Sequence, residues 1–180
     1  MKFSMLVVIF SSLLIFSSCV KSIDTENKYA LIEKNGTDKE QFEAGKDYYF
    51  GRGVTADNEK AFKFFSSSSN KGNPYADHYL GRMYYLGIYV EKNEPKALNY
   101  FNNSIDIIIN DSQNDNTEAF YCLGWCYYAG VGVLKDIQEA VKWWRKATEQ
   151  GDATAQFNLG MVLCEWGGCS QEHAGSRKVV

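Results

Sequence analysis

A serine followed three residues later by a lysine, at Ser68 and Lys71, is the residue pair most suggestive of chemistry in this sequence. One class of acyl-transfer enzymes takes its nucleophile from such a Ser-x-x-Lys string and also carries a Lys-Thr-Gly segment. The sequence has no Lys-Thr-Gly segment, and the string lies in a serine run before a glycine break. His78 and His173 are the only histidines, and their spacing supports no Ser/His/Asp arrangement. We therefore interpret the string as a chance match and expect no catalytic residue.

Charge and glycine spacing narrow the range of ligands. The formal net charge is -3 at pH 7, and no run of Lys or Arg forms a basic patch. A nucleic-acid-binding surface needs such a patch, so we expect no nucleic-acid partner. Gly51–Gly53 and Gly130–Gly132 look like phosphate-binding glycines, but they follow predicted helices rather than strands. We therefore expect no cofactor.

A pattern of glycines and aromatic residues recurs along the chain. Gly45, Gly81, Gly124 and Gly160 are separated by 36, 43 and 36 residues, so the second interval holds seven extra residues. Around the first three glycines the same residue types recur in register. They are Tyr48–Tyr49, Tyr84–Tyr85 and Tyr127–Tyr128; Gly51–Val54, Gly87–Val90 and Gly130–Val133; Ala61, Ala97 and Ala140; and Phe64–Phe65, Tyr100–Phe101 and Trp143–Trp144. Such self-similarity is typical of stacked repeats.

Each repeat predicts a pair of helices. Ala76, Leu80 and Tyr84 follow one another at helical spacing and share one face. The turn glycines end the first helix, because glycine accepts a left-handed backbone. The second helix then begins after a residue whose side-chain oxygen can accept from free amides, which predicts N-caps at Asp57, Asn93 and Asp136.

The repeated string Leu-Gly-x-x-Tyr-Tyr-x-Gly-x-Gly-Val, followed by Asp, Ala and Trp-Trp-x-Lys-Ala, resembles the SEL-one-like repeat family, relatives of the tetratricopeptide repeat. The resemblance covers roughly residues 39–166 and is nearly complete over residues 119–151. The second unit departs from it at Tyr89, and the fourth departs from it after Gly160. The resemblance implies an all-α fold: an α-solenoid of about three and a half helix–turn–helix repeats, forming a tetratricopeptide-like superhelix.

The same resemblance implies a scaffold that binds a protein or peptide partner and is not an enzyme. In related solenoids the first helices line the concave face, and there the candidate partner-binding residues are Lys46, Asp47 and Arg82, with Cys126 beside them. We interpret the tyrosine stripe as core rather than as the lining of a ligand groove: Tyr48, Tyr84 and Tyr127. His78 is expected to be partly exposed.

The alternative is a β-lactamase-like enzyme, because some exported members of this family are cysteine-rich and have been described as β-lactamases. Those proteins carry a cysteine pair in each repeat, whereas the first two units here have no cysteine. Cys126 and Cys164 lie on neighbouring first helices and are a candidate disulfide, with packed free thiols as the other interpretation. The remaining cysteines of the repeats are Cys122 and Cys169, and their spacings fit a zinc ribbon poorly, so we expect no metal site.

The N-terminus has the features of an export signal. Lys2 precedes an apolar stretch, Met5–Phe16, that is too short for a comfortable membrane span. The string Phe16–Cys19 resembles a bacterial lipobox, which implies cleavage before Cys19 and lipidation of its thiol. By family analogy, Val20 in place of Asp favours sorting to the outer membrane over retention in the inner membrane. We therefore expect an exported lipoprotein at the outer membrane or the periplasmic face rather than in the cytoplasm. An ordinary secretory signal is the alternative.

These features divide the chain as follows: a signal peptide of lipoprotein type at 1–18, a tether at 19–36, repeat 1 at 37–72 and repeat 2 at 73–115. Repeat 3 follows at 116–151, a partial repeat 4 at 152–168 and a tail at 169–180. The extra residues of repeat 2 are expected to lengthen its second helix through Ile107–Ile109 and to form a polar loop over Asn110–Asn116.

Overall fold

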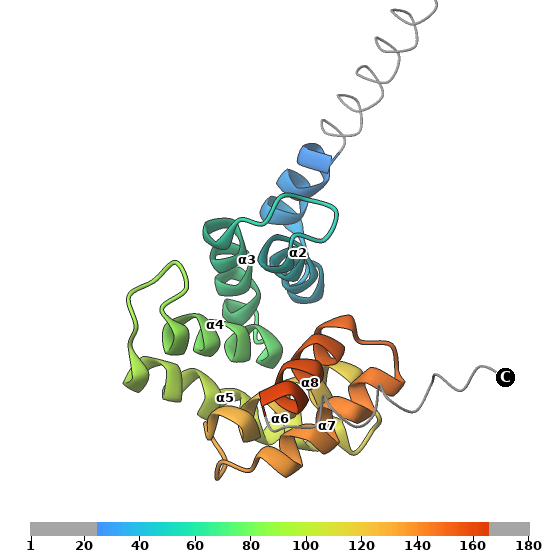
Figure 1. Ribbon diagram of the computed structural model, residues 1–180. Helices are drawn as coiled ribbons and strands as arrows, with labels where there is room; N and C mark the ends of the chain where they lie inside the picture. The colour runs from blue at the N-terminus through green and yellow to red at the C-terminus, as the bar shows by residue number, and fades with distance from the viewer. Residues whose placement is uncertain (1–24, 166–180) are drawn as a thin grey trace, which may run out of the picture. The chain divides into compact units, whose positions relative to one another are not determined.

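The computed structural model describes residues 25–165 of the chain. All of the regular secondary structure in this range is helical. No strand occurs within this range, and the predicted all-α fold is confirmed. Residues 25–35 are helical. The other helices are α2 (Asp38–Phe50), α3 (Asn58–Asn70), α4 (Pro74–Leu86), α5 (Glu94–Ser112), α6 (Thr117–Ala129), α7 (Ile137–Glu149) and α8 (Ala153–Glu165) (Figure 1).

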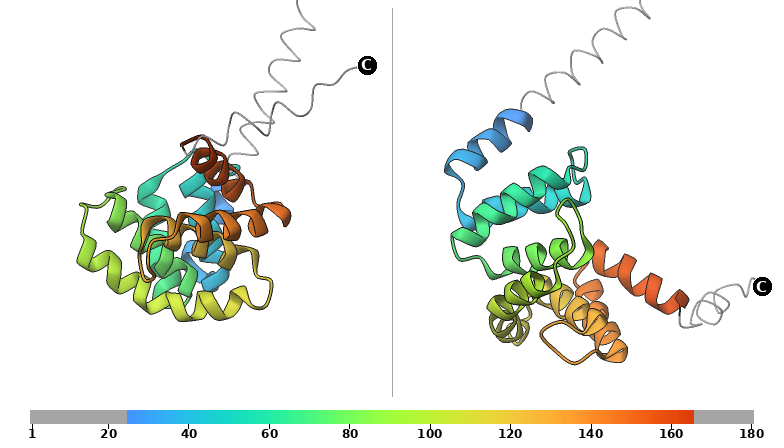
Figure 2. Two further views of the ribbon diagram at one scale, coloured as in Figure 1. Left: turned by 60° about the horizontal axis from the view of Figure 1, so that its bottom comes forward. Right: turned by 90° about the vertical axis from the view of Figure 1, so that its left-hand side faces the viewer.

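The chain divides into two compact units, with the boundary in the sequence between Asn73 and Pro74. The first unit holds residues 25–35, α2 and α3, and its α2 packs against α3, as Figure 2 shows. In the second unit α4 packs against α5 and α6 packs against α7, while α8 packs against α7. In the second unit α6 also contacts α4 and α5, so the two helix pairs pack against each other. Both units are thus built from helix pairs.

Side-chain caps start the second helix of each pair. The backbone N–H of Lys60 donates to the Asp57 carboxylate at 3.0 Å, and that of Lys96 donates to the Asn93 side chain at 3.0 Å. Asp136 accepts from two backbone N–H groups at 2.9 and 3.1 Å. Each cap satisfies amides that have no partner within the helix, so the predicted N-caps are confirmed.

The turn inside each pair requires a left-handed backbone. In the third pair Gly130 and Gly132 have φ values of 72° and 71°. Tyr89 stands where the second pair would have its second glycine, and it still adopts a φ of 64°. A residue with a side chain loses roughly 1–2 kcal/mol in this conformation. Tyr89 thus adopts the left-handed backbone despite this cost, and the packing of α4 against α5 offsets it.

An aromatic ring of the second helix packs directly on a glycine of the first. A Cβ atom added to Gly45 would lie 2.5 Å from the Phe65 ring, and one added to Gly124 would lie 2.4 Å from the Trp144 ring. The same contact joins Gly81 to Phe101, at 2.8 Å. The alanine four residues before each ring is fully buried: Ala61, Ala97 and Ala140. Glycine and alanine together let the two backbones approach closely around a buried ring.

Two segments differ from the sequence prediction. Residues 25–35, predicted as part of a tether, form a helix that packs on α2, where Gln41 Nε2 donates to the Ile32 carbonyl at 3.1 Å. The lengthened helix of repeat 2 is found as α5, but it runs to Ser112 and takes in the start of the predicted polar loop. No helix among residues 25–165 is long and apolar enough to cross a membrane. The predicted signal peptide, Cys19, Cys169 and the tail lie outside the described residues.

The glycine contact yields a paired mutational test. Gly124→Ala places a methyl group inside the Trp144 contact and is expected to lower the free energy of unfolding by about 1–3 kcal/mol. Gly160→Ala is the matched control, because no described atom lies within 4 Å of that position. There the better helix propensity of alanine is expected to add roughly 0.5–1 kcal/mol. Urea unfolding followed by circular dichroism measures both, and equal effects would contradict the role given to the ring.

Candidate functional site

A groove runs along one side of the first unit. It consists of two adjoining cavities of about 660 and 430 Å³ that share Glu26, Tyr48 and Lys60 as lining residues. The first cavity is completed by the turn after α2, at residues 51–57. The second is completed by α3 and by the helix of residues 25–35, including Tyr29 and Phe64. The groove therefore exists because residues 25–35 pack on the α2–α3 pair.

Stacked aromatic rings form the floor of this groove. The Tyr48 and Phe64 ring centroids lie 5.7 Å apart at 9°, and the Tyr29 centroid lies 5.0 Å from that of Tyr48. The Tyr29 hydroxyl donates to the Asp47 carboxylate at 2.7 Å. Burial, and then the hydrogen bond to Asp47, raise the pKa of the Tyr29 phenol far above its usual range. The floor is thus a neutral, apolar surface at physiological pH.

Charged side chains line the rim of the groove. Lys60 Nζ lies 5.1 Å from the centroid of the Tyr48 ring, and Lys63 Nζ pairs with the Glu59 carboxylate at 2.8 Å. Burial raises the pKa of the Tyr48 phenol, and the Lys60 ammonium offsets part of that rise. Glu26 and Glu33 supply carboxylates on the opposite helix. An aromatic floor between ammonium and carboxylate groups can hold an apolar side chain while pairing with polar groups beside it.

The second pair repeats part of this arrangement. Tyr84 and Tyr100 stack with centroids 5.8 Å apart at 8°, and Lys96 Nζ lies 4.3 Å from the Tyr84 centroid. Tyr48 is buried, as predicted, but it also lines the groove, which the prediction had excluded, and Tyr84 and Tyr127 are only half-buried. The third pair has Glu139 at the position of Lys60 and Lys96. The recurrence of lysine three residues after the cap was the sequence signal that could have identified both cation–aromatic contacts.

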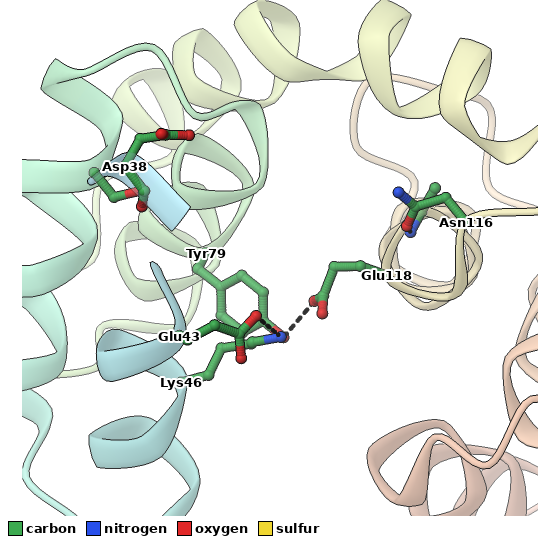
Figure 3. A network of polar contacts seen from close by, with 8 residues as sticks. Asp38, Glu43, Lys46, Tyr79, Asn116 and Glu118 are labelled. Carbon is green, nitrogen blue, oxygen red and sulfur yellow. Dashed lines mark hydrogen bonds and ion pairs between the residues drawn. The ribbon is translucent and has the colours of Figure 1, made fainter. Parts of the chain in front are cut away.

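The three predicted partner-binding residues are all engaged within the fold. Lys46 is only 7% exposed, so its predicted surface position is wrong; its ammonium pairs with Glu43 at 2.9 Å and lies over the Phe42 ring. Asp47 is half-buried and accepts the bond from Tyr29. Figure 3 shows the ion pair of Lys46 and Glu43. None of the three predicted residues lines the groove of the first unit.

Arg82 is likewise buried, at 8% exposed, and its predicted surface position is wrong. Its guanidinium lies 5.1 Å from the Trp125 ring and 5.4 Å from the rings of Tyr79 and Tyr121. It also donates to the Tyr121 hydroxyl. Tyr79 donates in turn to the Glu118 carboxylate at 3.0 Å, as Figure 3 shows. Arg82 therefore joins α4 to α6 and is not free for a partner.

His78 and Cys126 face each other in the same interface, with His78 Nδ1 3.8 Å from Cys126 Sγ. His78 is fully buried, so the expectation of partial exposure was wrong. Burial, and then the Arg82 charge, lower the pKa of His78 well below its usual range, while burial raises the pKa of the Cys126 thiol to about 12. Both groups are neutral at pH 7, and Cys126 is not an activated thiolate.

The predicted disulfide between Cys126 and Cys164 is wrong. Cys126 and Cys122 are free, buried thiols, because the α4–α6 contact directs Cys126 towards His78. Cys164 takes part in a disulfide whose other half lies outside the described residues. Among residues 25–165, no cluster of three or more potential ligands could hold a metal ion.

The Ser-x-x-Lys string has a structural role at the end of α3. The Ser68 hydroxyl is buried and donates to the Asp38 carbonyl at 2.6 Å. The Lys71 ammonium donates to the Gly36 carbonyl. Both side chains are therefore directed at backbone carbonyls near the start of α2, and this geometry lends no support to a nucleophile and base.

The buried His78 predicts a pH dependence of stability. The unfolded chain binds a proton at this imidazole below about pH 6.5, whereas the folded chain does not, so acid favours unfolding. Between pH 6.5 and 5 the free energy of unfolding is expected to fall by up to about 1.4 kcal/mol per pH unit more in the wild type than in His78→Phe. Urea midpoints at several pH values test this, and parallel curves for the two proteins would refute it.

Comparison with known proteins places these helix pairs in a family. Residues 41–73, 74–106, 117–152 and 153–173 match the Sel1 repeat. The Arabidopsis thaliana protein described as ERAD-associated E3 ubiquitin-protein ligase component HRD3B is 32% identical over 133 residues. That match covers 64% of this chain and 20% of the plant protein, so the chain spans about a fifth of its relative's length.

Three solved structures are similar to the chain. The protective antigen c5321 of uropathogenic Escherichia coli, described as displaying an SLR fold, is 35% identical over 71% of this chain and 26% of its own, with a TM-score of 0.43. A Sel1 repeat protein from Oxalobacter formigenes is 28% identical over 76% and 97%, with a TM-score of 0.41. Helicobacter pylori cysteine rich protein B is 26% identical over 68% and 96%, with a TM-score of 0.35. Because the matched repeats span more than half of its length, this chain belongs to the Sel1 repeat family.

Proposed function

We propose that this chain is an exported, lipid-anchored Sel1 repeat scaffold that binds a protein or peptide partner at the cell envelope. Family membership supports a binding role, because stacked helix pairs offer extended surfaces for other polypeptides. The plant relative is named as a component of a ubiquitin ligase, which is an assembly of proteins. The carrying observation is the groove of the first unit, where an aromatic floor lies between ammonium and carboxylate groups.

The groove suits a peptide segment with mixed polarity. Its floor of Tyr29, Tyr48 and Phe64 can bury an apolar side chain, and its rim offers Lys60 and Glu33 to side chains on either flank. Cavities of this size hold a few residues of chain rather than a folded domain. A partner would therefore insert a short segment and contact the surrounding helices with the rest of its surface.

A lipid on Cys19 would place this groove near the bilayer. Six peptide steps separate Cys19 from Thr25, which lines the groove and is the first described helical residue. Even a fully extended chain spans only about 20 Å over that length. The proposed partner is therefore a protein of the same envelope membrane or one that approaches it closely.

Charge reversal in the groove tests the binding proposal. In Lys60→Glu/Lys63→Glu, both ammonium groups of the rim become carboxylates, and partner recovery in a crosslinked pulldown from envelope membranes is expected to fall at least about tenfold. Lys142→Glu/Arg145→Glu is the matched control, because both residues are exposed on α7 and distant from the groove in sequence. Equal recovery of the partner by the two double variants would remove the groove from the proposal.

Mass spectrometry of the mature N-terminus tests the anchor. The expected product begins at Cys19 and carries a diacylglyceryl group, and it sediments with membranes. In Cys19→Ser the thiol that takes the lipid is gone, so the protein is expected to leave the membrane fraction. A wild-type protein that is cleaved without lipid and stays in the soluble fraction would instead establish an ordinary secretory signal.

A further inference from the structure

The first two helix pairs of the second unit meet where α4 packs against α6. The helices of each pair contact each other extensively, whereas α4 and α6 share a much smaller contact. Arg82 donates to the Tyr121 hydroxyl, and the Tyr79 and Tyr121 rings stack with centroids 6.2 Å apart. Proteins open locally at such boundaries between supersecondary motifs. We call this contact the α4–α6 seam, formed by His78, Tyr79 and Arg82 of α4 and by Tyr121, Trp125 and Cys126 of α6.

The imidazole of His78 lies inside this seam and is fully buried. Its ring centroid lies 5.5 Å from that of Phe101 and 5.6 Å from that of Trp125. Its Nδ1 faces Cys126 Sγ at 3.8 Å, and no described group makes a hydrogen bond with its Nε2. A buried polar atom without a partner is costly and is rare in folded proteins. The closed seam therefore accommodates a neutral imidazole between apolar walls and offers nothing to bind a second proton on it.

The charges around His78 oppose its protonation while the seam is closed. Burial, and then the Arg82 guanidinium on the same helix, lower the pKa of the imidazole, and no carboxylate of the described residues raises it. The groups that face it from α6 are the Cys126 thiol and the Trp125 ring, and α5 contributes the uncharged Phe101 ring. The carboxylate of Glu118 accepts from the Tyr79 hydroxyl. A protonated His78 would thus stand beside Arg82 as a second buried cation without a counter-ion.

We propose that the α4–α6 seam is an acid-sensitive switch, which opens when His78 takes up a proton and lets the two helix pairs part while each pair stays folded. The open form exposes the imidazole and binds the proton below about pH 6.5, whereas the closed form does not, so acid favours opening. Opening also exposes Trp125 and the Cys126 thiol, both buried in the closed form. The use of this switch to regulate binding rests on the scaffold function proposed above, but the opening itself does not.

Labelling of the Cys126 thiol in the purified full-length protein tests the switch. The reagent is dithiodipyridine, and each rate is divided by that of the same cysteine in a peptide of α6, which cancels the change in thiolate fraction with pH. From about pH 7.5 to about pH 5 this ratio is expected to rise about 30-fold in the wild type, as one proton on an exposed imidazole requires. His78→Phe and His78→Gln are expected to abolish the rise. His173→Gln, which removes the other histidine, is the matched control and should retain it.

Amide hydrogen exchange of α7 in the same samples separates opening of the seam from global unfolding. At about pH 5 the opening seen by the Cys126 thiol is expected to be at least about tenfold more frequent than the opening that exposes the amides of α7. A labelling ratio that is equal at the two pH values, or that rises equally in both His78 variants, overturns the proposal. So does exchange of α7 that keeps pace with the labelling, because the whole unit would then be unfolding. The labelling needs no partner, so its result is independent of the pulldown that tests the scaffold function.

Discussion

The contact of an aromatic ring with a bare stretch of helix backbone is the constraint on which the rest of this structure depends. Phe65, Phe101 and Trp144 each occupy the space where a side chain would stand on the facing glycine. Burying such a ring contributes roughly 2–3 kcal/mol, and only a glycine leaves the space that the ring fills against the neighbouring helix. The alanine one turn earlier then has to be small, and the turn between the helices has to return the chain antiparallel within a few residues. The small alanine and the tight turn of each pair thus follow from the close approach of the second helix's ring to the glycine of the first helix.

The second consequence concerns the polar side chains. Once each pair is closed by its ring, the first helices of the second unit meet one another, and α4 meets α6 through Arg82, His78 and Tyr79. A buried guanidinium is costly unless its charge is compensated. Here three rings surround it and a phenol accepts from it. Arg82 and His78, whose residue types suggest chemistry, are therefore structural in this interface.

The sequence predicted what repeats and missed what occurs once. The helix pairs, their caps and the core position of Tyr48 follow from residue types at fixed spacing, because periodicity encodes local structure. The burial of Lys46 and Arg82 could not be read this way, since a first helix is contacted on more than one side and a long side chain can bury its stem. The helix at residues 25–35 did have a signal. Tyr29 precedes Gly45 by 16 residues, as Phe65 precedes Gly81 and Trp144 precedes Gly160.

That register makes the two ends of the described array physically unlike. Residues 25–35 hold the place of a second helix, and their aromatic residue is satisfied by the pair that follows, through the Asp47 hydrogen bond and the ring of Tyr48. The helix α8 holds the place of a first helix, and its glycine has no ring among the described residues. The aromatic side chain of a second helix can pack on the pair that follows it, as Tyr29 does on Tyr48. A glycine has no side chain with which to make an equivalent contact. The first end of the described array therefore buries its aromatic ring and forms a groove, whereas the glycine side of α8 is open among residues 25–165.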